Sequence, residues 1–305
     1  MARIAAIGLI EHDAILLLDS FPNSGETARI SAISHSPGGT TANTAVALVR
    51  LGESVTLRAV IGNDDRGDEL LKHFDAGGID CGMITRTEAP TSTSTILLET
   101  QTGERTILWH EGSTIRKGDQ LDVADLFSHD VVILDVLDEP LRRFLTDLPA
   151  HTRPDVRLLG PITHLVDNAE PDAVEIAFRF DTIVGNERQY LQLLGLERVE
   201  EIDIDVQRRM PGANLRAAIV TSGAQGCRWV TRDERGATSA FVVDTVDTTG
   251  AGDAFVAGIA WSMARRLPWP DATRFASAVA ALSTRSVGAQ TALPTLSDVE
   301  LLLNE

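Results

Sequence analysis

Short apolar runs alternate along this chain with segments whose apolar residues recur at the spacing of a helix. The run at 131–135, VVILD, is apolar nearly throughout, as expected for a strand that helices cover on both faces. The pattern predicts strands at 4–8, 55–60, 131–135, 156–159, 182–184 and 217–221, and helices at 40–51, 65–76, 139–146, 187–194, 251–266 and 269–283. We therefore expect an α/β fold whose doubly wound, mostly parallel sheet is flanked by helices.

Two regions, 14–34 and 91–110, depart from this pattern because their apolar and polar residues alternate. Segments 94–99 and 105–109 are predicted strands, joined by a hairpin turn at 100–104. Strands with one polar face, inserted among βα units, indicate a small separate sheet, and the natural place for it is a lid over the ligand end of the main sheet. The alternative is that they are edge strands of the main sheet. We expect one domain spanning residues 1–305, with lid strands inserted within about 14–34 and 91–110.

Composition and charge narrow the classes of partner. The formal net charge of −17 argues against binding to nucleic acid or an anionic membrane, which would need clustered Lys and Arg. No apolar run reaches the roughly 20 residues of a membrane span. Lys72 and Lys117 are the only lysines, so a phosphate site must use arginine, backbone amides or a metal. The two cysteines, Cys81 and Cys227, are isolated, which predicts a reducing, cytoplasmic location.

The segment DTTGAGDAF at 247–255 follows a predicted strand at 241–244 and opens a helix rich in small residues. Glycines let a ligand approach the backbone closely, and the free N–H groups of a first helical turn attract anions. Asp253 lies in that turn, where it is either a simple helix-start acid or a base that takes a proton from an attacking hydroxyl. A carboxylate beside a phosphate site favours the second role.

The segment PGGTTAN at 37–43 places two glycines, Gly38 and Gly39, before a helix whose first turn contains Asn43. The Asn43 amide can both donate and accept hydrogen bonds, which suits a sugar hydroxyl. The alternative is a plain turn into a helix with Asn43 in solvent.

Both segments resemble the signatures of the ribokinase-like (PfkB-type) carbohydrate kinases, and matched segments run in the family's order from Gly8 to Gln290. The resemblance implies a ribokinase-like α/β fold with a β lid, in which ATP and a sugar bind. It also implies that Gly250, Ala251 and Gly252 offer amides to the transferring phosphate, and that Asp253 is the catalytic base. The sugar contacts that it implies are Asp13, Gly38, Gly39, Asn43 and Asp138.

Three further segments resemble the family's nucleotide side: VGNERQ at 184–189, TSGAQG at 221–226 and SVGAQ at 286–290. The nucleotide contacts that they imply are Asn186, Thr221, Gly223, Gly226 and Gly288. Gln189 stands where the family has the glutamate that helps to organise magnesium, so we expect Glu187 to take over part of the outer coordination sphere of Mg²⁺. The resemblance places Asp247 and Thr249 around a monovalent cation, K⁺, beneath the glycine loop. The alternative is that Asp247 only accepts hydrogen bonds from loop amides.

Two positions depart from the family's pattern. Thr40 stands where a lysine often follows the glycine pair in ribokinases, which weakens the case for ribose. Gln189 replaces the glutamate expected in the NxxE motif, which leaves room for a protein that has lost turnover.

Other enzyme classes find little support in the sequence. The chain has no GxxxxGK[ST] segment of a P-loop enzyme, and no GxGxxG follows its first predicted strand. The seven histidines lack the spacing of a zinc site, and His164, close to Gly160 and Pro161, is interpreted as structural.

We therefore expect an ATP-dependent sugar kinase that phosphorylates a hydroxyl, preferably a primary one, of a ribose, a fructose or a keto-deoxy sugar acid. The alternatives are a nucleoside kinase of the same family, for which the lid offers chiefly Trp109 as a stacking partner, and a sugar-binding sensor. A vitamin or pyrimidine kinase on the related fold would lack the lid strands. We also expect a homodimer formed through the lid, because its strand edges and apolar face would otherwise be exposed.

Overall fold

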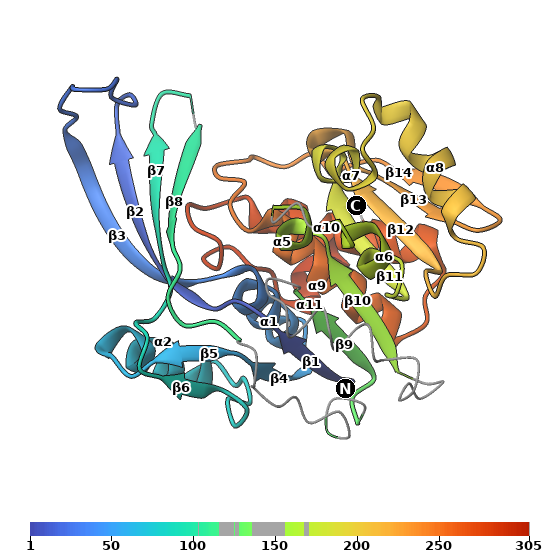
Figure 1. Ribbon diagram of the computed structural model, residues 1–305, viewed down its shortest axis with the longest axis horizontal. Coiled ribbons are helices and arrows are strands. Elements are labelled where there is room, and N and C mark those ends of the chain that lie inside the picture. Colours follow the sequence, from blue (N-terminus) through green and yellow to red (C-terminus); the bar gives the residue numbers. More distant parts are fainter. Residues whose placement is uncertain (103, 116–124, 126–127, 136–155, 168–170, 305) are drawn as a thin grey trace.

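The structure is a computed structural model, and it describes residues 1–304 apart from 103, 116–124, 126–127, 136–155 and 168–170. The larger of its sheets has eight strands, in the spatial order β14 (Arg235–Thr238), β13 (Cys227–Thr231), β12 (Ala217–Thr221), β11 (Thr182–Asn186), β10 (Arg157–Pro161), β9 (Val131–Leu134), β1 (Arg3–Ile7) and β4 (Ser54–Arg58) (Figure 1). The strands from β4 to β12 pair in parallel, whereas β13 and β14 are antiparallel.

Helices cover both faces of this sheet (Figure 1). One face is covered by α1 (Thr40–Arg50), α2 (Asp65–Ala76), α9 (Ala251–Ala264), α10 (Trp269–Ser283) and α11 (Leu296–Leu303). The other is covered by α5 (Thr163–Asp167), α6 (Ala173–Ala177), α7 (Glu187–Leu194) and α8 (Ile202–Arg209). Successive residues of β1 therefore enter different cores: Ile4 packs with the first group of helices and Ala5 with the second. This explains why the central strands are apolar without alternation.

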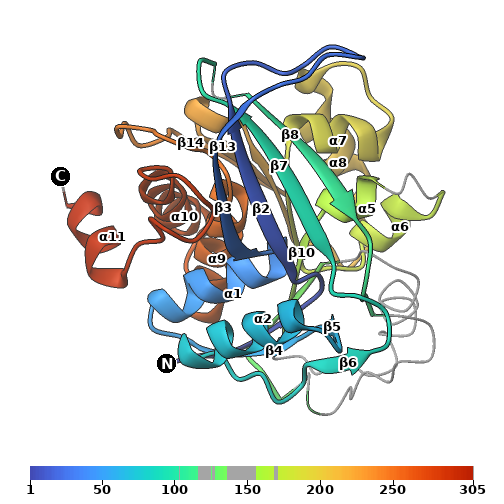
Figure 2. The ribbon, with the colours of Figure 1, turned by 90° about the vertical axis from the view of Figure 1, so that its left-hand side faces the viewer.

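A smaller sheet projects from the main body, with its strands in the order β3 (Ile30–Gly38), β2 (Glu11–Leu18), β7 (Thr93–Glu99) and β8 (Arg105–His110) (Figures 1 and 2). Strand β2 pairs in parallel with β7, and the outer pairs are antiparallel. A separate pair, β5 (Val60–Gly62) and β6 (Thr85–Thr87), and two short 3₁₀ turns, η2 (Val199–Glu201) and η3 (Gly223–Gln225), complete the described elements.

The predicted fold class, a doubly wound and mostly parallel sheet with helices on both faces and a smaller sheet beside it, is confirmed. One predicted strand is wrong. Residues 241–244 form no strand, and Val242 is 99% exposed, because this alternating segment has no neighbouring strand to pair with in the described structure. The predicted helix at 139–146 and the predicted sugar contact Asp138 lie outside the described residues. Within those residues, no helix is both long and apolar enough to cross a membrane.

Candidate active site

The glycine loop at Gly250 begins helix α9 with a cluster of unsatisfied backbone donors. Gly250 has a φ of 76°, and a Cβ there would lie 2.7 Å from the Ala289 Cβ, so only glycine fits. Within the described structure, the N–H groups of Gly250, Gly252 and Asp253 have no hydrogen-bond partner, whereas the Ala251 N–H donates to the Thr248 carbonyl at 3.2 Å. The loop therefore offers free amides to an anion at the positive end of the helix dipole.

Asp253 lies in the first turn of α9 and meets α1 across the site. The Asn43 Nδ2 group donates to Asp253 Oδ2 at 2.8 Å, and the Gln290 side chain donates to Asn43 Oδ1 at 2.9 Å, which fixes the orientation of the amide. Burial raises the pKa of Asp253 to about 7; the Asn43 hydrogen bond opposes this shift, and the charge on Asp135 adds to it. A carboxyl group with this pKa is suited to accept a proton near neutral pH.

Two buried carboxyl groups of β2, Glu11 and Asp13, form a second wall of the site. Asp13 is 6% exposed, and its Oδ1 atom, like Oε2 of Glu11, has no hydrogen-bond partner in the described structure. Burial, followed by the charges of Glu11 and Asp253, raises the pKa of Asp13 to about 8. A Cβ at Gly38 would lie 2.0 Å from Asp13 Oδ2, so this glycine makes room for the carboxylate. Unpartnered buried acceptors are what a polyhydroxylated ligand would satisfy.

A polar cluster that the sequence did not indicate lies next to these carboxylates. Asp135, 1% exposed at the end of β9, accepts hydrogen bonds from the Thr40 hydroxyl and from His164 Nδ1, the latter at 2.8 Å to Oδ1. Thr40, which replaces the lysine of many ribokinases, is thus anchored by a carboxylate. His164, predicted to be structural, forms an ion pair with Asp135 when it is protonated, and its charge lowers the pKa of Asp253.

The small sheet contributes one cation to the glycine loop. Arg105, the first residue of β8, donates from Nη1 to the hydroxyl groups of Thr248 and Thr249 at 3.3 and 3.4 Å. Its charge lowers the pKa of both Asp247 and Asp253. Sequence analysis required arginine, backbone amides or a metal at the phosphate site but could not name this arginine, because no motif surrounds it.

Asp247 ties the glycine loop to the segment that follows α10. Its Oδ1 atom accepts hydrogen bonds from the Thr249 N–H at 2.9 Å and the Thr249 hydroxyl at 2.7 Å, and its Oδ2 atom accepts one from the Gly288 N–H at 2.8 Å. These hydrogen bonds lower the pKa of Asp247 against the opposing effect of burial, so the group is ionised at neutral pH.

The predicted nucleotide residues lie at the carboxyl ends of β11 and β12, where Asn186 and Thr221 are paired in register. Asn186 caps α7: its Oδ1 accepts from the Gln189 N–H at 2.9 Å, while Gln189 Oε1 accepts from the Asn186 N–H at 2.8 Å. Gln189 Nε2 also donates to the Thr163 hydroxyl at 3.0 Å, whereas an ionised glutamate could only accept from that hydroxyl. Gln189 thus caps the helix as a glutamate would, because the capping group is the side-chain oxygen.

Two further features define the nucleotide side. Gly223 and Gly226 both have positive φ values, 55° and 96°, in the tight turn after β12. The Glu187 carboxylate accepts from the Ser222 hydroxyl at 2.8 Å and pairs with Arg228 at 2.9 Å. Glu187 is therefore held in place by protein groups.

The structure thus brings Asp13, Gly38, Asn43 and Asp253 into one cluster beside the glycine loop, and it places Asn186, Thr221 and the turn at Gly223 along the same edge of the sheet. In doubly wound folds, ligands bind at this edge, beyond the carboxyl ends of the strands.

A sequence model described as "pfkB family carbohydrate kinase" matches residues 1–296 of the chain. A ribokinase from Bacillus subtilis (strain 168) is 28% identical over 315 residues, covering 100% of both chains, and a probable chloroplastic fructokinase-6 from Arabidopsis thaliana is 30% identical over 92% of this chain and 78% of its own length. The structure of an Arabidopsis thaliana ribokinase complexed with ribose and ATP superimposes with a TM-score of 0.84 at 22% identity, covering 100% of this chain and 99% of the other.

Proposed function

The chain belongs to the pfkB family of carbohydrate kinases, and we propose that Asp253 is the base with which it transfers the γ-phosphate of ATP to a primary hydroxyl of a small sugar. The observation that supports this role most strongly is the position of Asp253. Its carboxyl group, with a pKa of about 7, belongs to the same first turn of α9 as the free N–H groups of Gly250 and Gly252. Base and phosphate site are thus adjacent in one helical turn.

In the proposed reaction, Asp253 accepts the proton of the sugar hydroxyl while the hydroxyl oxygen attacks the γ-phosphorus. The bond from phosphorus to the bridging oxygen breaks, and ADP leaves. The amides of Gly250 and Gly252 and the Arg105 guanidinium stabilise the charge on the transferring group, which accounts for most of the catalysis in such reactions. The unpartnered oxygens of Glu11 and Asp13 accept hydrogen bonds from other sugar hydroxyls.

The charges around the sugar favour a neutral substrate over a sugar acid. Asp135 is 1% exposed and its negative charge raises the pKa of Asp253, whereas Asp13, whose own pKa is raised to about 8, is largely protonated at neutral pH and offers the sugar a neutral carboxyl group. A substrate carboxylate beside Asp135 would be repelled at short range in a medium where charge interactions are strong. We therefore propose ribose, fructose or a related neutral sugar.

A nucleoside is the second candidate, on the strength of Trp109. The strand register places Trp109 opposite Ser94, and Ser94 opposite Asp13, so the indole and the Asp13 carboxylate share one face of the small sheet. Trp109 is 43% exposed there and could stack on a base.

Two ions complete the proposal. Mg²⁺ would neutralise charge on the ATP phosphates, which together with water supply ligands to this ion in kinases. Glu187, held by Arg228, would suit an outer position around it. A monovalent cation, K⁺, would share the ionised carboxylate of Asp247 with the amides of Thr249 and Gly288 and would lie near Thr249. The proposed K⁺ site is tested by measuring activity in K⁺ and in tetramethylammonium at equal ionic strength. Equal rates would mean that no cation is needed and that Asp247 has a purely structural role.

We also propose that the small sheet is a lid within a single domain spanning residues 1–305, that the chain forms a homodimer through this lid, and that it works in the cytoplasm. The lid assignment is supported by the contact of Arg105 with the glycine loop. The location is supported by two cysteines, both free, that do not pair with each other.

The decisive experiment for the substrate is an ATP-consumption screen against pentoses, hexoses, sugar acids and nucleosides. We expect turnover with a neutral sugar. Turnover of a sugar acid alone would contradict the charge argument, preference for a nucleoside would support the role of Trp109, and binding of a sugar without turnover would indicate a sensor.

A further inference from the structure

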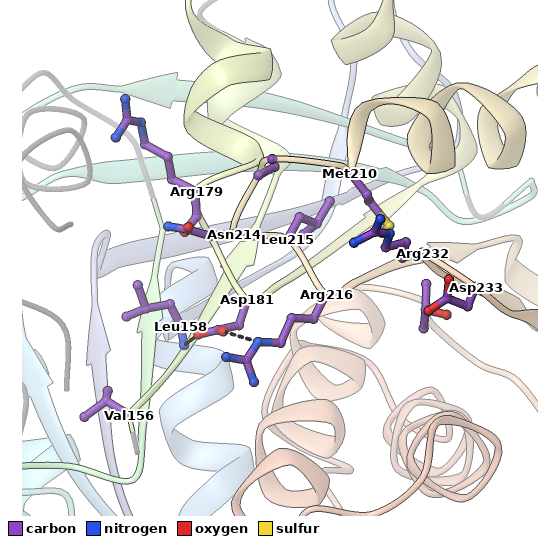
Figure 3. A pocket seen from close by; sticks show the side chains of 13 residues that line it. Val156, Leu158, Arg179, Asp181, Met210, Asn214, Leu215, Arg216, Arg232 and Asp233 are labelled. Atoms are coloured by element: carbon purple, nitrogen blue, oxygen red, sulfur yellow. Dashed lines mark hydrogen bonds and ion pairs between the residues drawn. The ribbon is translucent and has the colours of Figure 1, made fainter. Parts of the chain in front are cut away.

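A pocket of about 680 Å³ lies at the amino ends of the central strands, opposite the candidate active site (Figure 3). Among the residues that line it, Val156 directly precedes β10, Asp181 directly precedes β11 and Arg216 directly precedes β12. We call it the amino-end pocket. Because the glycine loop and the sugar carboxylates lie at the carboxyl ends, the thickness of the sheet separates this pocket from the proposed reaction.

The lining of the amino-end pocket is mainly polar. Leu158, Met210 and Leu215 lie beneath it, but each is at most 4% exposed, so the protein itself already covers them. The rim carries Arg216 and Arg232, which are both exposed, together with the carboxylates of Asp181 and Asp233. A concave site with a few charged groups suits a small polar ligand.

The arginines of the rim have more donors than the protein uses. Arg216 Nε lies 3.1 Å from Asp181 Oδ1, and Asp181 Oδ2 accepts the Leu158 N–H at 2.8 Å, so one carboxylate serves both groups (Figure 3). In the part of the chain that the structure describes, the terminal Nη groups of Arg216 have no hydrogen-bond partner, and Arg232 has no ion pair.

Two more arginines add positive charge behind this rim. Arg157 is the first residue of β10, and Arg266 follows the end of α9. Burial lowers the pKa of Arg157, and the charges of Arg266 and Arg216 lower it further, opposed by Asp181. Arg157, Arg216 and Arg266 therefore lie close together in a chain whose net charge is −17, and the lining of the pocket sets two carboxylates, Asp181 and Asp233, against its arginines. Such a concentration of like charge is unfavourable by itself and is relieved by an anion.

We propose that the amino-end pocket binds a small organic anion, whose phosphate or carboxylate group pairs with Arg216 and Arg232 and whose remaining part fills the pocket beside them. The planar guanidinium group binds either kind of anion through two parallel hydrogen bonds, so both are members of the same ligand class. The site is additional to the sugar and ATP sites and does not depend on the proposed reaction.

Calorimetric titration of the full chain tests this site. The probes are phenyl phosphate, benzoate and inorganic phosphate, each added with Mg²⁺ and a non-hydrolysable ATP analogue at saturation, so that the glycine loop is already occupied. We expect one equivalent of phenyl phosphate or benzoate to bind, and inorganic phosphate to bind more weakly because it fills less of the pocket. Comparing the two organic probes shows which anionic group is preferred.

Two variants locate the binding. Arg232→Gln removes a charge that has no ion pair in the described structure, and Arg216→Lys keeps a charge opposite Asp181 but loses the planar fork. Each should raise the dissociation constant of the organic probe about tenfold or more, which corresponds to the loss of one charge-assisted hydrogen bond. Arg235→Gln, the same change at an exposed arginine of β14, is the control and should bind as the unaltered protein does.

The proposal is overturned if neither organic probe binds at millimolar concentration. It is also overturned if both arginine variants bind the probe with unchanged affinity, since the anion would then lie elsewhere. Equal binding of inorganic and phenyl phosphate would also overturn it, because the pocket would then add nothing to the charge of the two arginines.

Discussion

The burial of Asp13 changes the free energy of unfolding by an amount that depends on pH. Its pKa of about 8 lies well above the usual value of 3.8, so the folded chain holds a proton that the unfolded chain releases. The contribution of Asp13 to stability is therefore present at low pH and is progressively lost as the pH rises from about 4 to about 8.

The first prediction follows from this linkage. Asp13→Asn keeps the shape of the side chain but cannot ionise, so it should raise the melting temperature at pH 8 more than at pH 5. Each kcal/mol of stabilisation corresponds to about 2 °C for a chain somewhat longer than 250 residues. Melting curves at the two pH values measure it. An equal shift at both would mean that Asp13 is not protonated in the folded state.

Arg105 is the residue on which the phosphate side depends most for positive charge. The second prediction is that Arg105→Gln lowers kcat by about 10²-fold, comparable to the loss of one donor to a developing oxyanion. Arg86→Gln, which removes an arginine paired with the exposed Asp68 far from the loop, is the control. Unchanged kcat in Arg105→Gln would exclude Arg105 from the proposed reaction.

At the scale of elements, two glycines at the start of α9 have different roles: Gly250 is needed for the backbone conformation, and we expect Gly252 to be needed for phosphate binding. Gly250 has a positive φ and contacts Ala289, whereas a Cβ at Gly252 would have no atom within 4 Å. The third prediction is that Gly250→Ala lowers both the melting temperature and activity, while Gly252→Ala keeps the melting temperature and loses activity because its Cβ points into the phosphate space. Thermal unfolding and kcat, measured on both variants, check this. Full activity in Gly252→Ala would place the phosphate elsewhere.

The elements that sequence analysis located best are those with strong local signals. Helix α2 has an Asp64 cap, whose carboxylate accepts the Gly67 N–H at 2.9 Å, and α10 has Pro270 in its first turn; both begin and end where predicted. Strand β12 also matches, because its apolar run is bounded by polar residues. The antiparallel pair β13 and β14 was not predicted, because its short strands lack a continuous apolar run.

The residues of the candidate site also fall into two groups, those that local sequence patterns predict and those that they do not. Glycine loops and their neighbours could be predicted because they form contiguous motifs. The meeting of Asn43 with Asp253, 210 residues apart, was implied only by the family, and that of Asp135 with His164 or Arg105 with Thr249 was not predicted at all. Such contacts depend on how distant elements pack, which local patterns do not encode.

At the scale of the whole molecule, the small sheet leaves one face uncovered. The strand register places Leu16, Leu97 and Ile33 on the face opposite Asp13, and Leu108 lies on the same face. Ile33 is 58% exposed and Leu108 is 54% exposed. An apolar face of this kind, on a sheet with free edges, supports the proposed pairing with a second copy.

The fourth prediction is that the unaltered chain is a dimer by light scattering at micromolar concentration, and that Ile33→Lys with Leu108→Lys makes it a monomer. Two charges on an apolar interface would each need to be desolvated. Val242→Lys, at a residue that is 99% exposed elsewhere, should leave the dimer intact. A monomeric unaltered chain would contradict the pairing.

The central claim is that Asp253 takes the proton from the sugar hydroxyl. The measurement that tests it most directly is kcat between pH 5.5 and 9 for the unaltered enzyme and for Asp253→Asn, on the best sugar of the substrate screen. Asp271→Asn is the matched control, because Asp271 is also the third residue of its helix, α10. The account predicts that kcat of the unaltered enzyme rises with pH through about 7, and that Asp253→Asn loses this dependence and on the order of 10²–10⁴ in rate. A variant that keeps near-normal kcat with the same pH dependence would contradict it.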